Sequence, residues 1–160
     1  MSEVTGAKKK AEKQLPLDRW VAYRFGLIAT RIGALAAPAY QEHHKLSTAA
    51  WRSLAVVAHL EPLSAATLSE HSRMDPSKVS RAIETLVGRK LLTREKDPAD
   101  QRRAVLRLTQ KGREIYADVS ASATRLEHEV TATLTAAERK ALWTVLDKID
   151  EQIQQHSAPG

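Results

Sequence analysis

Residues 64–112 read SAATLSEHSRMDPSKVSRAIETLVGRKLLTREKDPADQRRAVLRLTQKG, and the pattern in this stretch decides the fold. Ser64 can cap a short helix over residues 65–72, because its hydroxyl can accept a bond from the first turn. Asp75 is a strong N-cap for a second helix, and Pro76 suits its first position, where a missing N–H costs no hydrogen bond. The apolar residues of that helix recur at helical spacing and form one buried side: Val79, Ile83, Leu86 and Val87.

After this helix the hydrophobic period changes. Gly88 is placed to end the helix, since glycine is the residue most often found just past a helix end. Residues 91–96 and 103–108 predict two short strands, and residues 97–102 between them are rich in turn formers. A short helix, a tight turn, a capped helix and a two-stranded hairpin are typical of a winged helix-turn-helix. The predicted fold class is therefore mainly α with a small β-hairpin wing.

Long helical patterns flank this module on both sides. The first covers residues 17–40 and has Pro38 near its end, where proline would kink or terminate the helix. The second helix in chain order lies before the module and ends at Glu61 and Pro62. Capping residues precede the remaining helices: Ser47 or Thr48 before the second, Thr109 before the fifth, and Thr135 with Glu138, as a capping box, before the sixth.

The composition excludes several classes of protein. The chain has 160 residues, 42% of them hydrophobic, and no cysteine, which excludes disulfides, zinc sites with thiolate ligands and thiol nucleophiles. Residues 1–14 carry lysines without the apolar segment of a secretory signal. The most apolar stretch, residues 25–39, contains Arg31 and is shorter than the roughly 18 residues of a membrane span. We therefore expect a cytoplasmic protein.

The positive charge of the chain is concentrated in one quarter of its length. The formal net charge is +6 and the isoelectric point is about 9.7, which nucleic-acid-binding proteins share with other basic proteins. Residues 73–113 hold twelve cations against five anions, a net +7. A charge that served solubility alone would be spread out, so this concentration favours a phosphate-binding surface. The cations are Arg73, Lys78, Arg81, Arg89, Lys90, Arg94, Lys96, Arg102, Arg103, Arg107, Lys111 and Arg113.

The helix over residues 76–88 has a polar side opposite its apolar side. That side carries short hydroxyls and cations near the N-terminal end of the helix: Ser77, Lys78, Ser80, Arg81 and Thr85. An α-helix fits the major groove of DNA, where Arg and Lys can bond guanine edges and hydroxyls can bind phosphate. An ordinary solvated helix face is the alternative for each residue taken alone. Together with a cationic hairpin, however, the set predicts sequence-specific binding to double-stranded DNA.

The hairpin is predicted to end in a cationic turn that contains Arg102 and Arg103. An arginine on a protruding turn can enter the narrow minor groove of A·T-rich DNA, where the negative potential is enhanced. Asp100 can hold the guanidinium of Arg102 in position through a charge-assisted hydrogen bond. A plain salt bridge in a surface turn would be the interpretation if the preceding helix pair were absent.

The run from Leu68 to Gly112 resembles the MarR family of bacterial regulators, whose wing has the motif Asp-any-Arg before a Leu-Thr and a Gly. The long flanking helices extend the resemblance to roughly residues 17–153. It implies a dimeric winged-helix protein, usually a repressor, with its recognition helix at residues 76–88 and a wing arginine at Arg102. It also implies, in many members, release from DNA by a small aromatic or phenolic acid. The motif positions are Asp100, Arg102, Leu108, Thr109 and Gly112.

The flanking helices are longer than a lone winged helix needs. Their apolar stripes either pack within one chain or interleave between two subunits, and the family resemblance favours a homodimer. A two-fold dimer predicts a near-palindromic operator with half-sites about 34 Å apart, roughly one turn of DNA. We predict four segments: a disordered basic arm (1–14), an N-terminal dimerisation helix (15–46), a winged helix-turn-helix DNA-binding domain (47–110) and C-terminal dimerisation helices (111–156).

A candidate site for an acidic effector lies in the first two helices. Arg24 and Arg31 lie on or beside the apolar stripe of the first helix, so each needs water or an anion, supplied by a partner subunit or by a ligand. Rings follow between the two helices, and aromatic walls suit a flat aromatic acid. Packing and interface contacts are the alternative for each residue. The candidate ligand-binding residues are Arg24, Tyr40, His43, His44 and Trp51.

Other functions find less support in the sequence. We find no phosphate-binding loop, dinucleotide fingerprint or Gly-any-Ser-any-Gly elbow, and we predict that the protein is not an enzyme. Adjacent His43 and His44 do not complete a tetrahedral ligand set, so we predict neither a metal nor a cofactor. Two alternatives stay open: a regulator without a small-molecule ligand, and a winged helix that only contacts proteins. The second predicts an apolar exposed face on residues 76–88, where the sequence has a basic one.

Overall fold

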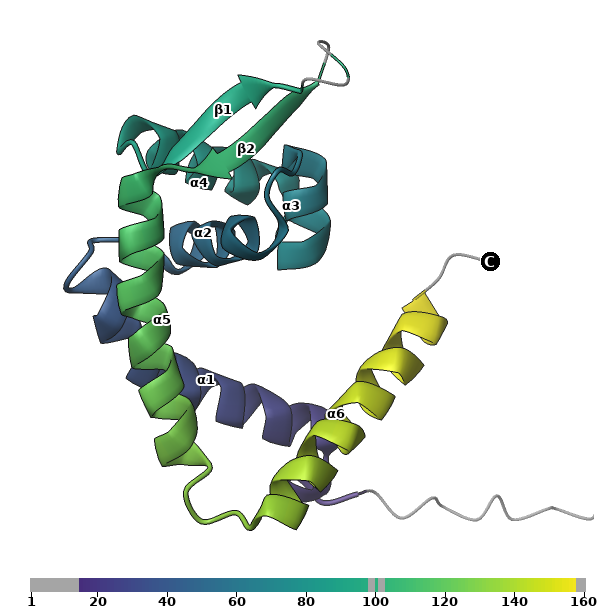
Figure 1. The fold of residues 1–160 in the computed structure, drawn as a ribbon. Helices are drawn as coiled ribbons and strands as arrows, with labels where there is room; N and C mark the ends of the chain where they lie inside the picture. Colours follow the sequence, from purple (N-terminus) through teal and green to yellow (C-terminus); the bar gives the residue numbers. More distant parts are fainter. Residues whose placement is uncertain (1–14, 98–99, 101–102, 158–160) are drawn as a thin grey trace, which may run out of the picture. The chain divides into compact units, whose positions relative to one another are not determined.

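The computed structural model describes residues 15–97, 100 and 103–157. The chain divides into two compact units, residues 1–35 and residues 36–160. The described residues form mainly helices and one two-stranded sheet (Figure 1), which confirms the predicted fold class. The elements are η1 (Leu17–Arg19), α1 (Val21–Gln41), α2 (Thr48–Leu60), α3 (Ala65–Ser72), α4 (Pro76–Gly88), β1 (Leu92–Lys96), β2 (Ala104–Leu108), α5 (Gln110–Val130) and α6 (Ala136–Ser157).

Side-chain caps begin the helices where the sequence predicted them. Each cap oxygen accepts a hydrogen bond from a first-turn N–H group that has no partner within the helix. Before α6, Thr135 and Glu138 form the expected reciprocal box: the Glu138 carboxylate accepts from the Thr135 N–H at 2.8 Å, and the Thr135 hydroxyl accepts from the Glu138 N–H at 3.3 Å. The other caps are Ser47 for α2, Ser64 for α3, Asp75 for α4 and Thr109 for α5.

The N-terminal helical stretch is interrupted once. The sequence predicted one helix over residues 17–40, but Trp20 is extended, with φ −75° and ψ 119°, and separates η1 from α1. The indole N–H of Trp20 donates to the carbonyl of Leu15 at 2.8 Å. Pro38 lies inside α1, which continues to Gln41. None of the described helices has the combination of length and apolar character that a membrane span requires.

Two helix ends use lysines in the left-handed region. α4 includes Gly88, and the residue with positive φ is Lys90, at 58°. The Leu91 N–H then donates to the Leu86 carbonyl at 2.8 Å, which closes the helix end. After α1, Lys45 has a φ of 52° in the same way. The sequence prediction that Gly88 marks the end of the helix is thus confirmed in position, while the left-handed turn falls two residues later.

The hairpin is joined to the rest of its unit through the second strand. β1 and β2 are antiparallel, with Leu92 opposite Leu108. On the other edge of β2, Leu106 donates its N–H to the Leu63 carbonyl at 2.9 Å and accepts from the Leu63 N–H at 3.4 Å. In Figure 1 the hairpin lies over α3 and α4, and both helices contact it. This pairing fixes the direction in which the hairpin leaves the core.

One cluster of buried apolar side chains holds α2, α3, α4, the hairpin and the first half of α5 together. Leu54, Leu68 and Leu86 have no exposed area. Burial of one leucine side chain stabilises the fold by about 1.5–3 kcal/mol relative to leaving it in water. The cluster therefore makes the winged-helix elements a stable platform for the polar residues on their outer side.

The start of α5 packs closely against the residues that follow α4. Thr109 donates its N–H to the Leu91 carbonyl at 3.1 Å and its hydroxyl to the Lys90 carbonyl at 2.7 Å. A Cβ atom at Gly112 would overlap that Leu91 carbonyl oxygen and lie 2.9 Å from Cδ2 of Leu108. Only glycine fits this position, which explains in physical terms why the wing motif ends on Gly112.

Candidate nucleic-acid interface

α4 turns one side to the core and the other to solvent. Of the predicted apolar positions, Val79, Ile83 and Leu86 are buried and Val87 is half-buried. The five residues predicted from this helix are all exposed: Ser77, Lys78, Ser80, Arg81 and Thr85. Lys78, Arg81 and Thr85 follow one another at three- and four-residue intervals, so they share one side of the helix. The structure thus presents two cations and a hydroxyl along a single outward face.

Asp75 organises the N-terminal end of α4. Its Oδ1 accepts hydrogen bonds from Oγ of Ser77 at 2.6 Å and from the Lys78 N–H at 3.0 Å, and its Oδ2 lies 3.4 Å from Nζ of Lys78. These contacts, the Ser77 bond first among them, lower the pKa of Asp75 from 3.8 to about 2. The side chains of Ser77 and Lys78 are therefore gathered at the start of the helix, where exposed N–H groups favour an anion.

Further along α4, the hydroxyl of Thr85 donates to the Arg81 carbonyl at 2.9 Å. This bond within the helix leaves the lone pairs of the Thr85 oxygen facing outward as acceptors. Arg81, one turn earlier, is exposed and carries five N–H donors in a planar fork. A donor fork beside an acceptor is suited to the edges of base pairs, which present both kinds of group.

An open pocket of about 320 Å³ is lined by α3, α4 and the hairpin. Ser80 and Glu84 line it from α4, and Arg94 lines it from β1. The pairing register places Arg94 opposite Leu106, on the face of the sheet that is turned towards α4. The sequence analysis counted Arg94 only as part of the net charge. Arg94 lies two residues after buried Leu92 in the same strand, and this spacing was the signal that could have placed it on the side of α4.

The turn of the hairpin is described in part. Arg103 is exposed, its N–H donates to the Asp100 carbonyl at 2.9 Å, and its carbonyl accepts from the Asp97 N–H at 2.9 Å. These backbone bonds close the hairpin and place Arg103 where its turn joins β2. Arg102 lies outside the described residues, and so does the predicted pair of Arg102 with Asp100.

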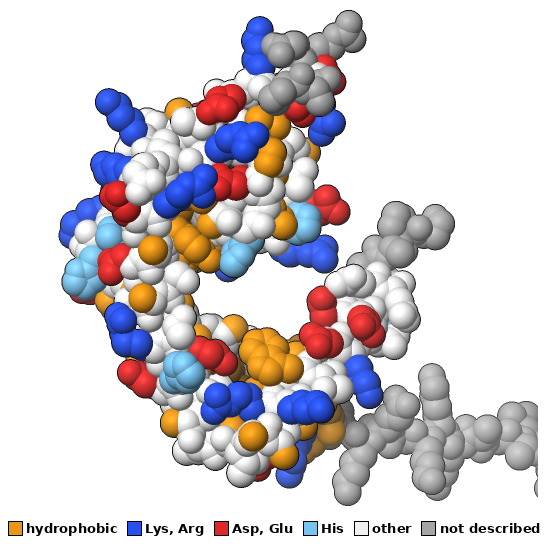
Figure 2. Space-filling model, viewed as in Figure 1, with side chains coloured by type: hydrophobic (Ala, Val, Ile, Leu, Met, Phe, Trp, Pro, Cys, Tyr) orange, Lys and Arg blue, Asp and Glu red, His pale blue; other side chains and the backbone are white. Residues whose placement is uncertain are grey.

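Several cations of residues 73–113 bond to protein atoms. Arg89 donates to two backbone carbonyls, Arg113 pairs with the Glu61 carboxylate, and Arg107 lies 3.8 Å from Glu95. The carboxylate of Glu61 also accepts from the Leu108 N–H at 2.6 Å, which ties the end of β2 to the end of α2. Figure 2 shows Lys and Arg side chains over the hairpin and neighbouring elements, mixed with Asp and Glu. The count of twelve cations therefore overstates the number available to a ligand.

Known proteins share the fold of this chain. Residues 44–103 match the model of the MarR family. The crystal structure of a MarR-family transcriptional regulator from Silicibacter pomeroyi has a TM-score of 0.80 and 28% sequence identity, and the match covers 91% of this chain and 100% of that one. Residues 44–103 of this chain thus match the MarR family, and most of the chain has the fold of a MarR-family transcriptional regulator.

Two curated relatives carry the same MarR-like segment. The uncharacterized HTH-type transcriptional regulator YdgJ of Bacillus subtilis is 28% identical over 100 residues, which cover 62% of this chain and 61% of the relative. The HTH-type transcriptional repressor NicR of Pseudomonas putida is 25% identical over 153 residues, which cover 89% and 94% of the two chains. The match thus spans less than two thirds of the first relative and nearly all of the second.

Two of the candidate effector residues pack on each other. The rings of Tyr40 and Trp51 stack with centroids 6.0 Å apart, and Trp51 stacks on Tyr116 of α5 at 5.9 Å. The hydroxyl of Tyr116 lies 2.9 Å from Nε2 of His59. Tyr40 is only 5% exposed, so these ring faces join α1, α2 and α5 in the core. The sequence analysis expected a ring cluster but missed its members Tyr116 and His59.

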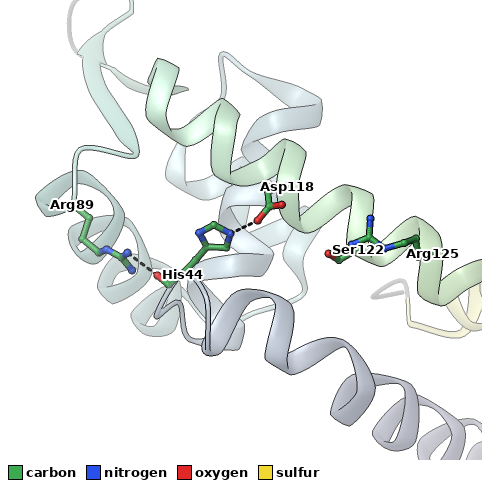
Figure 3. A network of polar contacts seen from close by, with 5 residues as sticks. All are labelled: His44, Arg89, Asp118, Ser122 and Arg125. Carbon is green, nitrogen blue, oxygen red and sulfur yellow. Dashed lines mark hydrogen bonds and ion pairs between the residues drawn. The ribbon is translucent and has the colours of Figure 1, made fainter.

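The other three candidates are separate from this stack. His44 Nε2 lies 2.7 Å from Oδ2 of Asp118 on α5 (Figure 3), and His43 beside it is exposed. Arg24 belongs to the unit of residues 1–35, in which its side chain is exposed. The stacked rings and His44 thus have partners of their own, whereas Arg24 and His43 are turned to solvent.

Proposed function

We propose that this MarR-family regulator is a sequence-specific protein that binds double-stranded DNA through α4 and the β1–β2 hairpin. The observation that carries the proposal is the outward face of α4. Lys78, Arg81 and Thr85 are exposed on this face, while the opposite face of the helix packs in the buried apolar cluster. In this proposal α4 enters the major groove, Arg81 and Lys78 bond guanine edges, and Ser77, Ser80 and Thr85 contact phosphate or bases.

The hairpin is proposed to add the second contact. Arg103, where the turn joins β2, and its sequence neighbour Arg102 would approach the minor groove while α4 lies in the adjacent major groove. Arg94 lines the open pocket beside α4 and would meet the phosphates between the grooves. Its long side chain starts from a strand that the core holds in place.

Apolar side chains outside the winged helix support a homodimer. Trp20, Ile28 and Leu35 are exposed in the first unit, as are Trp143 and Ile153 of α6 in the second. Exposed apolar residues in such numbers indicate a surface that another molecule covers. We propose that residues 15–46 and 111–156 form the dimer and that residues 47–110 bind DNA. Two copies would read a near-palindromic operator with half-sites about 34 Å apart.

We further propose that the protein is a repressor that a small aromatic acid releases from DNA. Support comes from the family resemblance and from Arg24, an exposed cation on a helix with exposed apolar residues. An aromatic acid would match this combination, because its carboxylate can pair with the cation and its ring can cover the apolar surface.

Selection of duplexes from a random pool, followed by titration of Arg81→Ala, tests the DNA-binding proposal. We expect the wild-type protein to enrich a near-palindromic duplex. The Arg81→Ala variant should lose about 1–3 kcal/mol of specific binding and relax the preference at one position of each half-site. Arg52→Ala, which removes an exposed arginine from α2, is the matched control. A wild-type protein that enriches no duplex, or an Arg81 variant with unchanged selectivity, would contradict the proposal.

A panel of aromatic carboxylates tests the effector. A ligand that binds the native protein raises its thermal midpoint, and an effector of the proposed kind also releases the selected duplex. Arg24→Gln should weaken both effects, whereas Arg19→Gln, a nearby exposed arginine of η1, should leave them unchanged. If no carboxylate both shifts the midpoint and releases DNA, the chain acts without a ligand of this class.

A further inference from the structure

Arg89, the residue directly after α4, forms hydrogen bonds to another segment of the protein. Its two terminal nitrogens donate to consecutive backbone carbonyls, to His44 at 2.7 Å and to Lys45 at 2.9 Å. These carbonyls belong to the turn between α1 and α2. A guanidinium is suited to this contact, since its planar fork can serve two acceptors at once. The C-terminal end of α4 is thereby fixed to a turn 44 residues earlier in the sequence.

The turn that Arg89 holds has a fixed and uncommon shape. Lys45 has positive φ, and the N–H groups of Lys45 and Leu46 donate to the carbonyls of Gln41 and Tyr40 at 3.1 and 2.9 Å. This is the pattern in which a left-handed residue closes a helix. Leu46 is buried, so the turn is anchored in the core on its far side. Arg89 therefore bonds to carbonyls whose positions the core determines.

The same turn is bonded to α5. The side chain of His44 is 19% exposed, and its ring N–H donates to the Asp118 carboxylate at 2.7 Å. Figure 3 shows Arg89 and Asp118 on opposite sides of His44, with the His44 backbone facing Arg89 and its ring facing Asp118. Beyond Asp118, α5 runs on to Val130, which is exposed. At about 1.5 Å per residue this outer part of α5 is roughly 18 Å long.

A second connection reaches the same junction from the start of α5. The Thr109 hydroxyl, which caps α5, donates to the carbonyl of Lys90, the residue next to Arg89. The segment after α4 is thus bonded to α5 directly through Thr109, and indirectly through the turn and His44. Two connections between the same helices, separated along α5, restrict rotation of one helix against the other more than either alone.

We propose that Arg89 is a positioning residue for the recognition helix, and that the His44–Asp118 contact couples its position to α5. The inference rests on the proposed DNA-binding function. Arg89 would set how α4 meets the base edges without touching DNA, and a displacement of the outer part of α5 would reach α4 through Asp118, His44 and Arg89. The sequence analysis had counted Arg89 among the cations of a predicted phosphate-binding surface.

Titration of Arg89→Gln against the selected duplex and a scrambled duplex, at several salt concentrations, separates the two roles. A positioning role predicts about tenfold weaker specific binding, the equivalent of two lost hydrogen bonds, with unchanged affinity for scrambled DNA. A phosphate contact would weaken both duplexes equally and reduce the salt dependence by about 0.9 in log–log slope. Arg89→Lys sharpens the test, because it keeps the charge but loses the fork. It should behave like Arg89→Gln if positioning matters, and like the wild type if charge matters.

The coupling to α5 is tested with His44→Ala, Asp118→Ala and the double variant. Each single change should weaken specific binding by about two- to fivefold, the range of a partly exposed pair, and the double variant should be no weaker than either. Arg52→Gln on α2 controls for loss of an exposed charge, and thermal midpoints identify variants that fail to fold. Additive losses, or equal losses on scrambled DNA, would overturn the proposal. A wild-type protein that prefers no duplex would instead overturn the DNA-binding function.

Discussion

The winged-helix elements and the long helices at the two ends of the chain use apolar side chains in opposite ways. From α2 to the first half of α5, leucines such as Leu54 and Leu68 are completely buried. In α6, Trp143 is 53% exposed, and Ile28 and Leu35 of α1 are exposed as well. The first region buries its hydrophobic residues within the chain, whereas the second leaves large ones exposed, as the proposed dimer requires. Changes in the two regions should therefore have different signatures.

The largest expected effect follows from the closest packing in the winged-helix region. In Gly112→Val, the new side chain would overlap the Leu91 carbonyl, a backbone atom that cannot move aside. We expect a loss of more than about 4 kcal/mol in the free energy of unfolding, or failure to fold. Urea unfolding measures it. Gly88→Ala is the control, since nothing lies within 4 Å of a Cβ there. Equal stability of the two variants would contradict the described fit of α5 against Leu91.

A matched pair of truncations sharpens the comparison of the two regions. Leu54→Ala should cost about 2–5 kcal/mol at every protein concentration, because it leaves a cavity in the core. Trp143→Ala should leave the winged helix intact and weaken association, so its deficit in thermal midpoint relative to the wild type should vanish at low protein concentration, where both are monomers. Unfolding at several concentrations, together with sedimentation equilibrium, distinguishes these outcomes. A Trp143 variant with unchanged association would remove α6 from the dimer surface.

The smallest effect concerns the N-cap of α4. The pKa of Asp75 is lowered to about 2 in the folded protein, mainly by the Ser77 bond, so its ionised form stabilises the fold above the ordinary pKa of 3.8. That contribution is lost as the pH falls from 3.8 to about 2. Asp75→Asn keeps a capping oxygen but does not titrate in this range. We expect the stability difference between wild type and variant to be constant above pH 4 and to change below it.

Unfolding measurements from pH 6 down to pH 2 follow this difference. Glu84→Gln, an exposed carboxylate on the same helix but outside the cap, serves as the control. A difference between wild type and Asp75→Asn that does not vary with pH would show that the Asp75 carboxylate titrates with an ordinary pKa.

Signals within a few residues of each other predicted most of the fold. Each N-cap depends on one side chain and an N–H group three residues later, so Asp75 and Thr109 could be recognised from sequence. The buried face of α4 follows from helical spacing for the same reason. The interruption at Trp20 was missed, because the apolar pattern continues through it while the backbone does not.

Contacts across long sequence separations could not be predicted. Arg89 looks like any other cation of its segment, and its two carbonyl partners lie 44 and 45 residues away. The stack from Tyr40 through Trp51 to Tyr116 needs the packing of three helices. Arg94 was within reach, since strand alternation and the burial of Leu92 already define its side of the sheet.

The pairing of β2 with Leu63 on one side and β1 on the other leaves β1 as the outer strand of the described sheet. An open strand edge is a template for a strand of another molecule, and long apolar edges promote aggregation. Here the edge is short, and three of its five residues are Arg94, Glu95 and Lys96. Charges at such an edge disfavour addition of a foreign strand. The hairpin can therefore protrude into solvent at high protein concentration without linking one molecule to the next.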